Sequence, residues 1–283
     1  MVNSLVYTLD EEGIHVQNRD VLHRDDEYDS ELFPLMMRMQ REHFWYLGRY
    51  RFLSGLLNRL VQGRTGLSAV DLGGGTGSWI AYLQQHHGEQ FAELALADSS
   101  RQALRLAAQV VAPGTERFQV DVTRPGWSAR WDTIFLLDVL EHLPDDIATM
   151  RQVATSLKPS GLAVVTMPAI QRFWSYNDDI VHHLRRYNIA DMKRMAEQTG
   201  MQLVDARYFN FFLSPLLVLS RIRRPPVESM GRDEIRALLE RTHRVPGPIV
   251  NQTLRLIFSA ETPLGLRMPF PWGTSIVGVF RQA

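Results

Sequence analysis

The sequence, 283 residues long, predicts an α/β fold in which helices cover both faces of a mostly parallel sheet. Two observations predict this class. From residue 67 onward, short apolar runs alternate with longer segments of helical periodicity, which is the rhythm of βαβ units. A glycine-rich turn also follows the first apolar run, and successive runs end at an aspartate. Ligands bind such sheets beyond the carboxyl ends of their strands, so we expect a site at that edge.

The segment before the sheet, residues 1–64, is expected to form an N-terminal helical cap. Its first part, Leu5–Gln17, has the pattern of a small hairpin, and Asp29–Leu60 has apolar residues at helical spacing over one or two helices. Trp45 and Arg49 lie in this stretch, shortly before the first strand. They either cover a ligand at the end of that strand or belong to a helix packed on the edge of the sheet, and the sequence leaves both open.

The glycine-rich turn, residues 73–77, joins the predicted buried strand Leu67–Leu72 to the start of a helix. Glycine tolerates positive φ in a tight turn and lets a ligand approach the backbone, and a helix start offers unpaired N–H groups. The dinucleotide fingerprint G-x-G-x-x-G needs a glycine where Ser78 stands, and the Gly-Lys-Ser/Thr ending of a nucleotide P-loop is absent. Asp71, just before the turn, suits a cationic ligand group better than a pyrophosphate.

Four more strands continue the alternation. They are predicted at Phe91–Ala97, Arg117–Val120, Thr133–Leu137 and Leu162–Met167, with helices at Ser100–Val111 and Asp145–Leu157. Asp98, Asp121 and Asp138 follow three of these strands directly, and Asp71 lies at the end of the first. Because the carboxyl ends of parallel strands meet at one edge of the sheet, the four carboxylates should line that edge.

The last third of the chain carries a helix, Ile189–Gly200, a strand, Met201–Tyr208, and a final strand, Thr274–Phe280. The long insertion between these two strands, residues 210–271, is expected to be a helical cap that contacts the substrate. Within it, Phe211–Ile222 is strongly apolar. We weigh three interpretations of this segment: a buried cap or dimer helix, a wall for an apolar substrate, or an interfacial contact with a membrane.

Composition narrows the class of protein. Lys plus Arg and Asp plus Glu both number 31, and this balance argues against nucleic acid as a partner, which requires a basic surface. No cysteine is present, so disulfides, thiolate metal sites and a cysteine nucleophile are excluded. The N-terminus has no apolar signal core, and no apolar run reaches the length of a membrane span. We therefore expect a soluble, cytoplasmic protein, with a homodimer as one option.

Five motifs carry a resemblance to a known family: VDLGGGTG (70–77), ALADSS (95–100), VDV (120–122), FLLDVLEHL (135–143) and LKPSGLAVVTMPA (157–169). Together they resemble class I S-adenosylmethionine-dependent methyltransferases of the bacterial small-molecule type, from about Phe44 to Tyr187 and again in the last strand. The flanks HFWYLGRYRFL (43–53) and WSYNDDIVHHLRRYN (174–188) are similar to that type as well. Ser160 departs from the family pattern, in which a second glycine is common.

The resemblance implies a Rossmann-like, seven-stranded, mostly parallel sheet. Residues 65–209 would form the cofactor-binding core, with a lid at residues 169–188 and the final core strand within residues 272–283. The implied cofactor is S-adenosyl-L-methionine, which is released as S-adenosyl-L-homocysteine. The residues implied to bind it are Trp45, Arg49, Asp71, Gly73, Gly74, Gly75, Gly77, Asp98, Ser99, Asp121, Val122 and Asp138.

The family also implies separate roles for these residues. Asp98 would hold the ribose hydroxyls, and Asp121 would accept a hydrogen bond from the adenine amino group, with the Val122 N–H nearby. Asp138 would face the methionine ammonium end of the cofactor, and Arg49 and Trp45 would close over that end.

The implied activity is methyl transfer by in-line displacement to a small-molecule or lipid-like acceptor, at oxygen or nitrogen. The candidate catalytic groups are His142, His183 and Tyr187, and the candidate acceptor-binding groups are Trp174, Tyr176, Arg185 and Arg186. No metal is expected, because no carboxylate lies at a clear ligand spacing from the His182–His183 pair. Two alternatives remain: a non-catalytic cofactor-binding subunit of a partner complex, and an NAD-dependent oxidoreductase, against which Ser78 argues.

Overall fold

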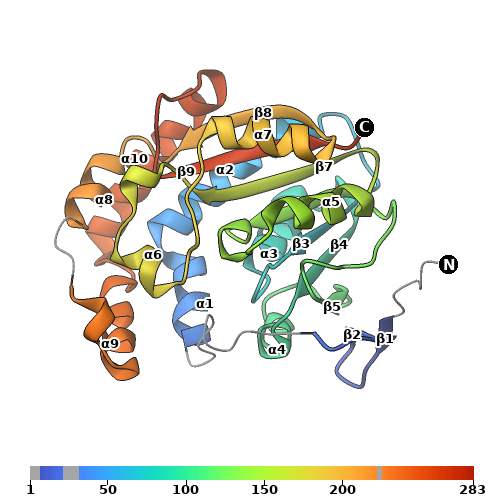
Figure 1. The fold of residues 1–283 in the computed structure, drawn as a ribbon, viewed down its shortest axis with the longest axis horizontal. Coiled ribbons are helices and arrows are strands. Elements are labelled where there is room, and N and C mark those ends of the chain that lie inside the picture. The colour runs from blue at the N-terminus through green and yellow to red at the C-terminus, as the bar shows by residue number, and fades with distance from the viewer. Residues whose placement is uncertain (1–6, 22–31, 222–224) are drawn as a thin grey trace.

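A single nine-stranded sheet forms the centre of the protein in the computed structural model, which describes residues 7–21, 32–221 and 225–283 (Figure 1). The strands are β1 (Tyr7–Leu9), β2 (Ile14–Gln17), β3 (Leu67–Leu72), β4 (Phe91–Asp98), β5 (Arg117–Gln119), β6 (Trp131–Leu137), β7 (Leu157–Pro168), β8 (Gln202–Phe209) and β9 (Ser275–Arg281). Their spatial order is β1-β2-β5-β4-β3-β6-β7-β9-β8. Strand β9 lies antiparallel between β7 and β8, whereas β3 to β7 are mutually parallel.

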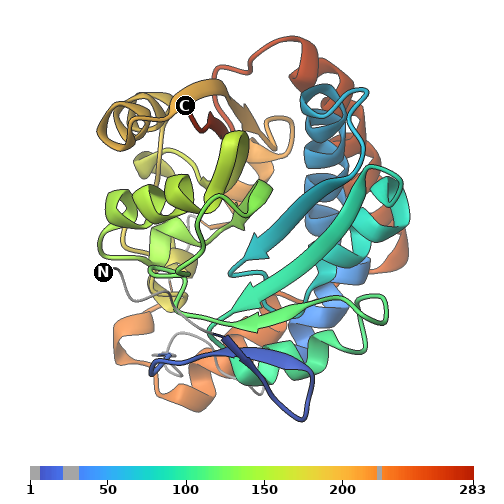
Figure 2. The same ribbon diagram turned by 90° about the vertical axis from the view of Figure 1, so that its right-hand side faces the viewer.

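The prediction of seven strands was wrong, because the N-terminal hairpin adds two further strands, β1 and β2, to the sheet. The sequence predicts the hairpin but not its place: β2 pairs in parallel with β5, and β1 pairs antiparallel with β2. Residues 7–17 therefore extend the sheet instead of belonging to a helical cap. Figure 2 shows the hairpin at one edge of the sheet. Without it, β5 would be an edge strand with unpaired backbone groups, which natural sheets usually cover.

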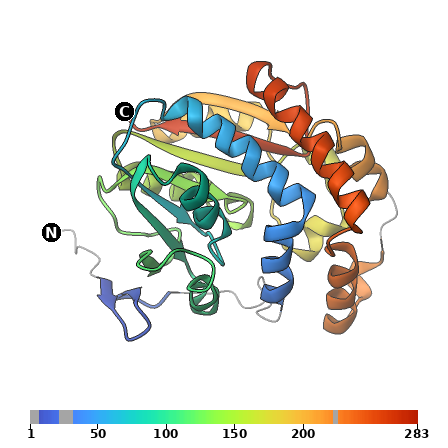
Figure 3. The same cartoon turned by 180° about the vertical axis from the view of Figure 1, so that it is seen from behind.

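Helices cover both faces of the sheet, as predicted. They are α1 (Phe33–Glu42), α2 (Phe44–Leu60), α3 (Ser78–His87), α4 (Arg101–Ala107), α5 (Asp146–Ser156), α6 (Tyr176–Ile180), α7 (Ile189–Thr199), α8 (Ser214–Ser220), α9 (Arg232–Thr242) and α10 (Pro248–Arg267). Figure 3 shows α2 and α10 side by side on one face together with α3, and Figure 1 shows α5 and α7 on the other. Each face buries its own apolar cluster, since successive strand residues such as Ala69 and Val70 point to opposite sides.

Helix α10 is held against α2 by close packing at a glycine. A Cβ atom at Gly48 would lie 2.2 Å from the ring of Phe258, so only glycine lets the two helices approach this closely. Asn251 of α10 also forms two hydrogen bonds at the junction of α1 and α2. Its side-chain Oδ1 accepts from the Phe44 N–H at 2.9 Å, and its Nδ2 donates to the Glu42 carbonyl at 2.7 Å. The C-terminal cap is thereby tied to the N-terminal helices.

The carboxyl edge of the sheet is where helices from distant parts of the chain meet. Helices α1, α6, α8 and α9 gather on this side of the molecule in both Figure 1 and Figure 3. Among the described residues, none of the helices is both long and apolar enough to cross a membrane. Ser160, where the family commonly has glycine, has φ of 62° inside β7, at an irregularity in its pairing with β6.

Candidate active site

In the glycine-rich turn, the space that a side chain would need is open at Gly75 and is occupied by neighbouring atoms at the other three glycines. Gly75 has φ of 55°, and a Cβ atom built there would meet nothing within 4 Å. At Gly74 the same atom would lie 2.4 Å from a carboxylate oxygen of Asp71. At Gly73 and Gly77 it would meet valine side chains at 2.6 and 2.7 Å. Gly74 is therefore required by packing, whereas Gly75 exposes bare backbone to an open space.

Helix α1 holds this turn from the outside through Gln40. Its Oε1 accepts hydrogen bonds from Thr76 Oγ1 at 2.8 Å and from Ser78 Oγ at 2.6 Å. Ser78, which departs from the dinucleotide fingerprint, is thus a structural partner of α1. Sequence reasoning missed Gln40, because the bond joins elements that are far apart in the chain and follows no local pattern.

Asp98 is fixed by two backbone groups at the end of β4. Its Oδ2 accepts from the Gly75 N–H at 2.8 Å, and its Oδ1 accepts from the Ser100 N–H at 2.8 Å. The carboxylate therefore spans the glycine turn and the start of α4, directly beside the open position at Gly75. Ser99 lies between these groups, and its carbonyl accepts from Gln119 Nε2 at 3.3 Å.

Asp121 lies in the loop after β5, which the N-terminal hairpin holds in place. Its Oδ1 accepts from the N–H and the hydroxyl of Thr123, at 2.9 and 2.7 Å. Its own N–H donates to Gln17 Oε1 at 3.2 Å, and Gln17 Nε2 donates to the Arg124 carbonyl at 2.8 Å. Val122 is half-buried in the same loop. Gln17 is a second residue of the site that sequence reasoning missed.

The charged side chains of Arg49, Asp71 and Asp138 interact with one another next to the turn. Arg49 of α2 forms an ion pair with Asp138, whose φ is 60° and whose Oδ1 accepts from Thr166 Oγ1 at 3.1 Å. Asp71 is buried, and in the described part of the chain its Oδ1 has no hydrogen-bond partner. Burial raises the pKa of Asp71 to about 7, with Arg49 opposing the rise. A carboxylate in this position favours a cation nearby.

Aromatic rings surround the Arg49 guanidinium. Its central carbon lies 4.7 Å from the ring centroid of Trp45, 5.3 Å from that of Tyr46 and 5.6 Å from that of Tyr50. These contacts hold the arginine side chain in one orientation, toward Asp138. Helix α2 packs on the sheet and also carries Trp45 and Arg49 at its edge, so both interpretations of this segment stay open.

A cavity of about 1540 Å³ opens from this edge toward the cap. Asp138, Glu141, His142 and His183 line its inner end, together with Trp45 and Tyr176. Its outer part is lined by apolar side chains of α1, α8 and α9, which are Met36, Met39, Leu217, Ile235 and Leu239, and also by the charged residues Arg232, Asp233, Arg236 and Arg244. The cavity therefore has a polar end at the sheet and mixed walls, partly apolar and partly charged, beyond it.

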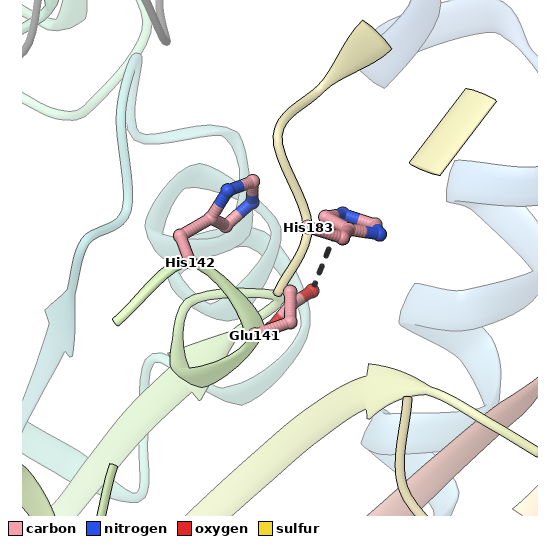
Figure 4. Close-up of side chains that lie close together, drawn as sticks. All are labelled: Glu141, His142 and His183. Carbon is pink, nitrogen blue, oxygen red and sulfur yellow. Dashed lines mark ion pairs between the residues drawn. The ribbon is translucent and has the colours of Figure 1, made fainter. Parts of the chain in front are cut away.

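Glu141, His142 and His183 lie together at the polar end (Figure 4). Glu141 Oε1 is 3.9 Å from His183 Nε2, and the two imidazole rings have centroids 4.8 Å apart. Glu141 is fully buried, and burial, with Asp138 nearby, raises the pKa of its carboxyl well above the ordinary value. Burial and the neighbouring His183 lower the pKa of His142 to about 3, so that this ring is neutral at pH 7.

The lid orients His183 through Asp178. Asp178 Oδ1 lies 2.8 Å from His183 Nδ1, and the carboxylate receives a two-pronged pair from Arg186, at 2.9 and 2.8 Å. Burial acts to raise the pKa of Asp178, but the bonds from His183 and Arg186 hold it well below its ordinary value. Arg186, a predicted acceptor-binding residue, is thus buried as the partner of Asp178, although it also lines the cavity.

Three other predicted residues point elsewhere. The Tyr187 hydroxyl donates to Asp146 Oδ2 at 2.8 Å, at the start of α5, and Arg185 contacts the same carboxylate at 3.2 Å. The Trp174 Nε1–H group donates to Asp179 Oδ1 at 2.7 Å. The Trp174 side chain lines a smaller pocket next to the large one. The structure therefore brings His142, His183 and Tyr176 to the large cavity but places Tyr187, Arg185 and Trp174 outside its lining.

Arg221, at the end of α8, lines the cavity and was missed by sequence reasoning. Burial, followed by the nearby charge of Arg186, lowers the pKa of Arg221. In the sequence this residue is part of an ordinary basic stretch, so no local signal distinguishes it.

Comparison with known proteins bears on the family and the fold of the chain. A family described as "Methyltransferase domain" matches residues 44–206, whereas no curated protein sequence matches the chain. Among solved structures, a chain from the complex between the Haloferax volcanii Trm112 methyltransferase activator and a proposed methyltransferase is similar, with a TM-score of 0.58 at 15% identity. The match covers 91% of this chain and 96% of that chain.

Two further structures are similar in the same way. A proposed sarcosine dimethylglycine methyltransferase from Galdieria sulphuraria has a TM-score of 0.55 at 15% identity, over 84% of this chain and 86% of its own. The [4+2]-cyclase SpnF has a TM-score of 0.56 at 14% identity, over 91% of this chain and 94% of its own. At such identities these likenesses show the fold alone. The family match covers more than half of the sequence, so the chain belongs to the methyltransferase domain family and is an S-adenosylmethionine-dependent methyltransferase.

Proposed function

We propose that this enzyme transfers the methyl group to an oxygen or nitrogen atom of a small-molecule or lipid-like acceptor, bound in the cavity between the lid, α1, α8 and α9. One observation carries the proposal. Asp138 belongs to the cofactor edge of the sheet, and it also lines the cavity together with His142 and His183. A single cavity therefore reaches the place where the methyl group is expected.

The residues at the sheet edge fit the cofactor. Gly75 provides open space beside bare backbone, the Asp98 carboxylate stands next to it, and Asp71 has a buried oxygen without a hydrogen-bond partner in the described part of the chain. Asp98 would hold the ribose hydroxyls, Asp121 the adenine edge, and Asp71 with Asp138 the ammonium end. When bound, S-adenosylmethionine would supply an electrophilic methyl group on a sulfonium: the acceptor lone pair attacks the methyl carbon in line, and S-adenosylhomocysteine leaves as the S–CH₃ bond breaks.

The walls of the cavity indicate the chemistry of the acceptor. Its apolar side chains suit an apolar body, and Arg221 offers a guanidinium to a carboxylate or phosphate on that body. Arg221 takes the place of Arg185 as the candidate anchor, because Arg185 is engaged with Asp146 at the start of α5. The acceptor we propose has a hydroxyl or amino group at the polar end and an anionic group near α8.

The protein's contribution to the reaction is position and exclusion of water. Arg49 and its aromatic neighbours cover the sheet edge, and the Asp178–Arg186 pair holds the lid beside His183. Holding the acceptor and the methyl group in line lowers the entropic cost of bringing the two together for reaction. We expect an acceptor hydroxyl to lose its proton next to Glu141, His142 and His183, which lie together at the polar end of the cavity.

The test is a methyl-transfer screen with the purified chain. We expect S-adenosylhomocysteine to form with at least one member of a panel of phenols, amines, carboxylated aromatics and prenyl compounds, and not in their absence. Product formation that needs an added partner protein would instead support the cofactor-binding subunit. Binding of NAD without binding of S-adenosylhomocysteine would contradict the assignment of the glycine turn.

A further inference from the structure

We propose that Glu141, His142 and His183 bind one divalent transition-metal ion at the polar end of the acceptor cavity. Each residue offers one ligand atom, and the three atoms lie within 4.8 Å of one another. All three side chains line the cavity, so an ion held by them would keep positions open toward the acceptor. Figure 4 shows the group, with Glu141 and His142 from the segment after β6 and His183 from the lid.

The distances suit an ion better than a direct hydrogen bond. Glu141 Oε1 and His183 Nε2 are 3.9 Å apart, which is too long for a shared proton to bridge. Metal–ligand bonds of about 2.0–2.2 Å place two ligand atoms roughly 3–4 Å from each other around one ion. The three ligand atoms lie up to 4.8 Å apart, so the side chains would have to move closer together when an ion binds.

Glu141 supplies independent evidence for a cation. It has an exposed fraction of 0%, and within the described residues neither of its carboxylate oxygens has a hydrogen-bond partner in another residue. Burial of a polar group without a partner is costly, and a buried carboxylate is normally paired or bound to a metal. Its oxygen faces His183, so the missing partner would lie between the two side chains.

The environment of His183 prepares its Nε2 atom to be a ligand. Asp178 is held ionised by the two bonds from Arg186, and an ionised carboxylate can only accept hydrogen bonds. His183 Nδ1 must therefore donate to Asp178, which leaves a lone pair on Nε2 in the neutral ring. A carboxylate behind a histidine in this way is the common outer partner of metal-binding histidines.

The donor set selects the class of ion. Two imidazoles and one carboxylate suit Zn²⁺, Mn²⁺, Fe²⁺ or Co²⁺, whereas Mg²⁺ and Ca²⁺ prefer sites made of oxygen alone. The role of the ion rests on the proposed function: it would bind the acceptor's hydroxyl oxygen and lower its pKa, so that the proton leaves to solvent and the oxygen lone pair can attack.

From the sequence alone no metal is expected, because no carboxylate lies at a clear ligand spacing from the His182–His183 pair. The structure provides one from another element. The backbone N–H of Leu184 donates to the Glu141 carbonyl at 2.8 Å, which docks the lid against the segment after β6. This docking brings His183 to Glu141 and His142, which are more than forty residues earlier in the chain.

The test measures metal binding by the full chain without cofactor or acceptor, so that its outcome is independent of methyl transfer. Protein stripped with a chelator is titrated with Co²⁺, and binding is followed by visible absorption and calorimetry. We expect one ion per chain. Glu141→Gln keeps the size of the side chain, and a buried amide in place of an unpartnered carboxylate should preserve the fold. It should lower affinity at least about 100-fold, since even outer partners of ligands contribute about 10- to 100-fold.

His183→Ala should lose the ion as well, and its melting temperature reports whether the lid survives. His86→Ala is the matched control, because His86 is an exposed histidine in the last turn of α3, at the opposite end of that helix from the glycine turn. Wild-type protein that binds no Co²⁺, or Glu141→Gln that binds it as tightly as wild type, would overturn the site. Loss of Co²⁺ binding in Glu141→Gln and His183→Ala but not in His86→Ala would support it.

Discussion

The two ends of the active site are built in different ways. At the cofactor end, polar side chains are fixed by backbone groups close by in sequence or in the next loop, as Asp98 is by Ser100 and Gly75. At the acceptor end, the polar side chains come from the lid, α8 and the segment after β6. There, in the described part of the chain, the carboxylate oxygens of Glu141 have no hydrogen-bond partner in another residue.

This difference indicates what each end is prepared to bind. At the cofactor end, Asp98 is already hydrogen-bonded to the backbone, and the buried Oδ1 of Asp71, which has no partner in the described residues, is left for the ligand. The acceptor end holds buried charge that a ligand or an ion would complete, which is the condition under which a polar group in a cavity favours a specific partner. Substitutions at the first end should therefore change cofactor affinity alone, and substitutions at the second should spare it.

The largest effect is expected for Gly75→Val. Its side chain would enter the open space beside the bare backbone, so affinity for S-adenosylhomocysteine should fall at least about 100-fold, or roughly 2.7 kcal/mol. Gly114→Val is the matched control, because Gly114 also has positive φ, 83°, and nothing within 4 Å of its Cβ position. Calorimetry that finds equal affinity in both variants would show that the turn is not the cofactor site.

Asp98→Asn should have the next largest effect. The amide keeps the size but loses the charged acceptor, and hydrogen bonds to charged groups contribute about 1.5–3 kcal/mol, or roughly tenfold in affinity and more. Because asparagine can accept only one of the two backbone bonds that Asp98 accepts, the melting temperature without ligand should also fall somewhat. A 2′-deoxy analogue of the cofactor should bind wild type and Asp98→Asn with similar affinity. If the analogue loses as much affinity on the variant as on wild type, the assigned ribose contact is wrong.

Asp71 should make cofactor binding depend on pH. Burial raises its pKa to about 7, and the ionised form attracts the ammonium end, so affinity should fall by about tenfold per pH unit below 7. Because the pKa is raised in the fold, ligand-free protein should lose stability as the pH rises from the ordinary aspartate pKa through 7. Asp71→Asn should flatten both profiles. Titration calorimetry and thermal melts at pH 5 to 8 would check them, and an unchanged profile in the variant would assign the dependence elsewhere.

The smallest effect is expected at Arg221, where Arg221→Gln should raise the KM for an anionic acceptor about fivefold, as for a partly exposed ion pair of about 1 kcal/mol. Cofactor affinity should stay the same. Arg185→Gln is the control, because Arg185 contacts Asp146 and the Pro144 carbonyl away from the cavity. A larger increase in KM for Arg185→Gln than for Arg221→Gln would instead support Arg185, the residue predicted from the sequence, as the anchor of the acceptor.

The same comparison explains how much the sequence could predict. The alternation of strands and helices, the glycine turn and the four strand-end aspartates are local patterns, and the structure places them as expected. The N-terminal hairpin was predicted as a unit, but its pairing with β5 joins residues about a hundred positions apart. Local periodicity carries no information about such pairing.

The acceptor end depends on contacts of this long-range kind. Gln40, Gln17 and Arg221 acquire their places only when distant elements pack together, and the docking of the lid decides which of two adjacent histidines faces Glu141. In the same way, Arg185 and Arg186 are neighbours in sequence, yet one contacts α5 and the other is buried against Asp178. Residue type alone could not separate them.

Helix α1 contacts both ends of the site, and this has a consequence for the kinetics of the reaction. Gln40 holds the glycine turn, while Met36 and Met39 of the same helix line the acceptor cavity. An acceptor seated against these methionines would restrain α1, and α1 would in turn restrain the turn that carries the cofactor. We therefore expect each ligand to strengthen the binding of the other, and a slower release of S-adenosylhomocysteine while the acceptor cavity is filled.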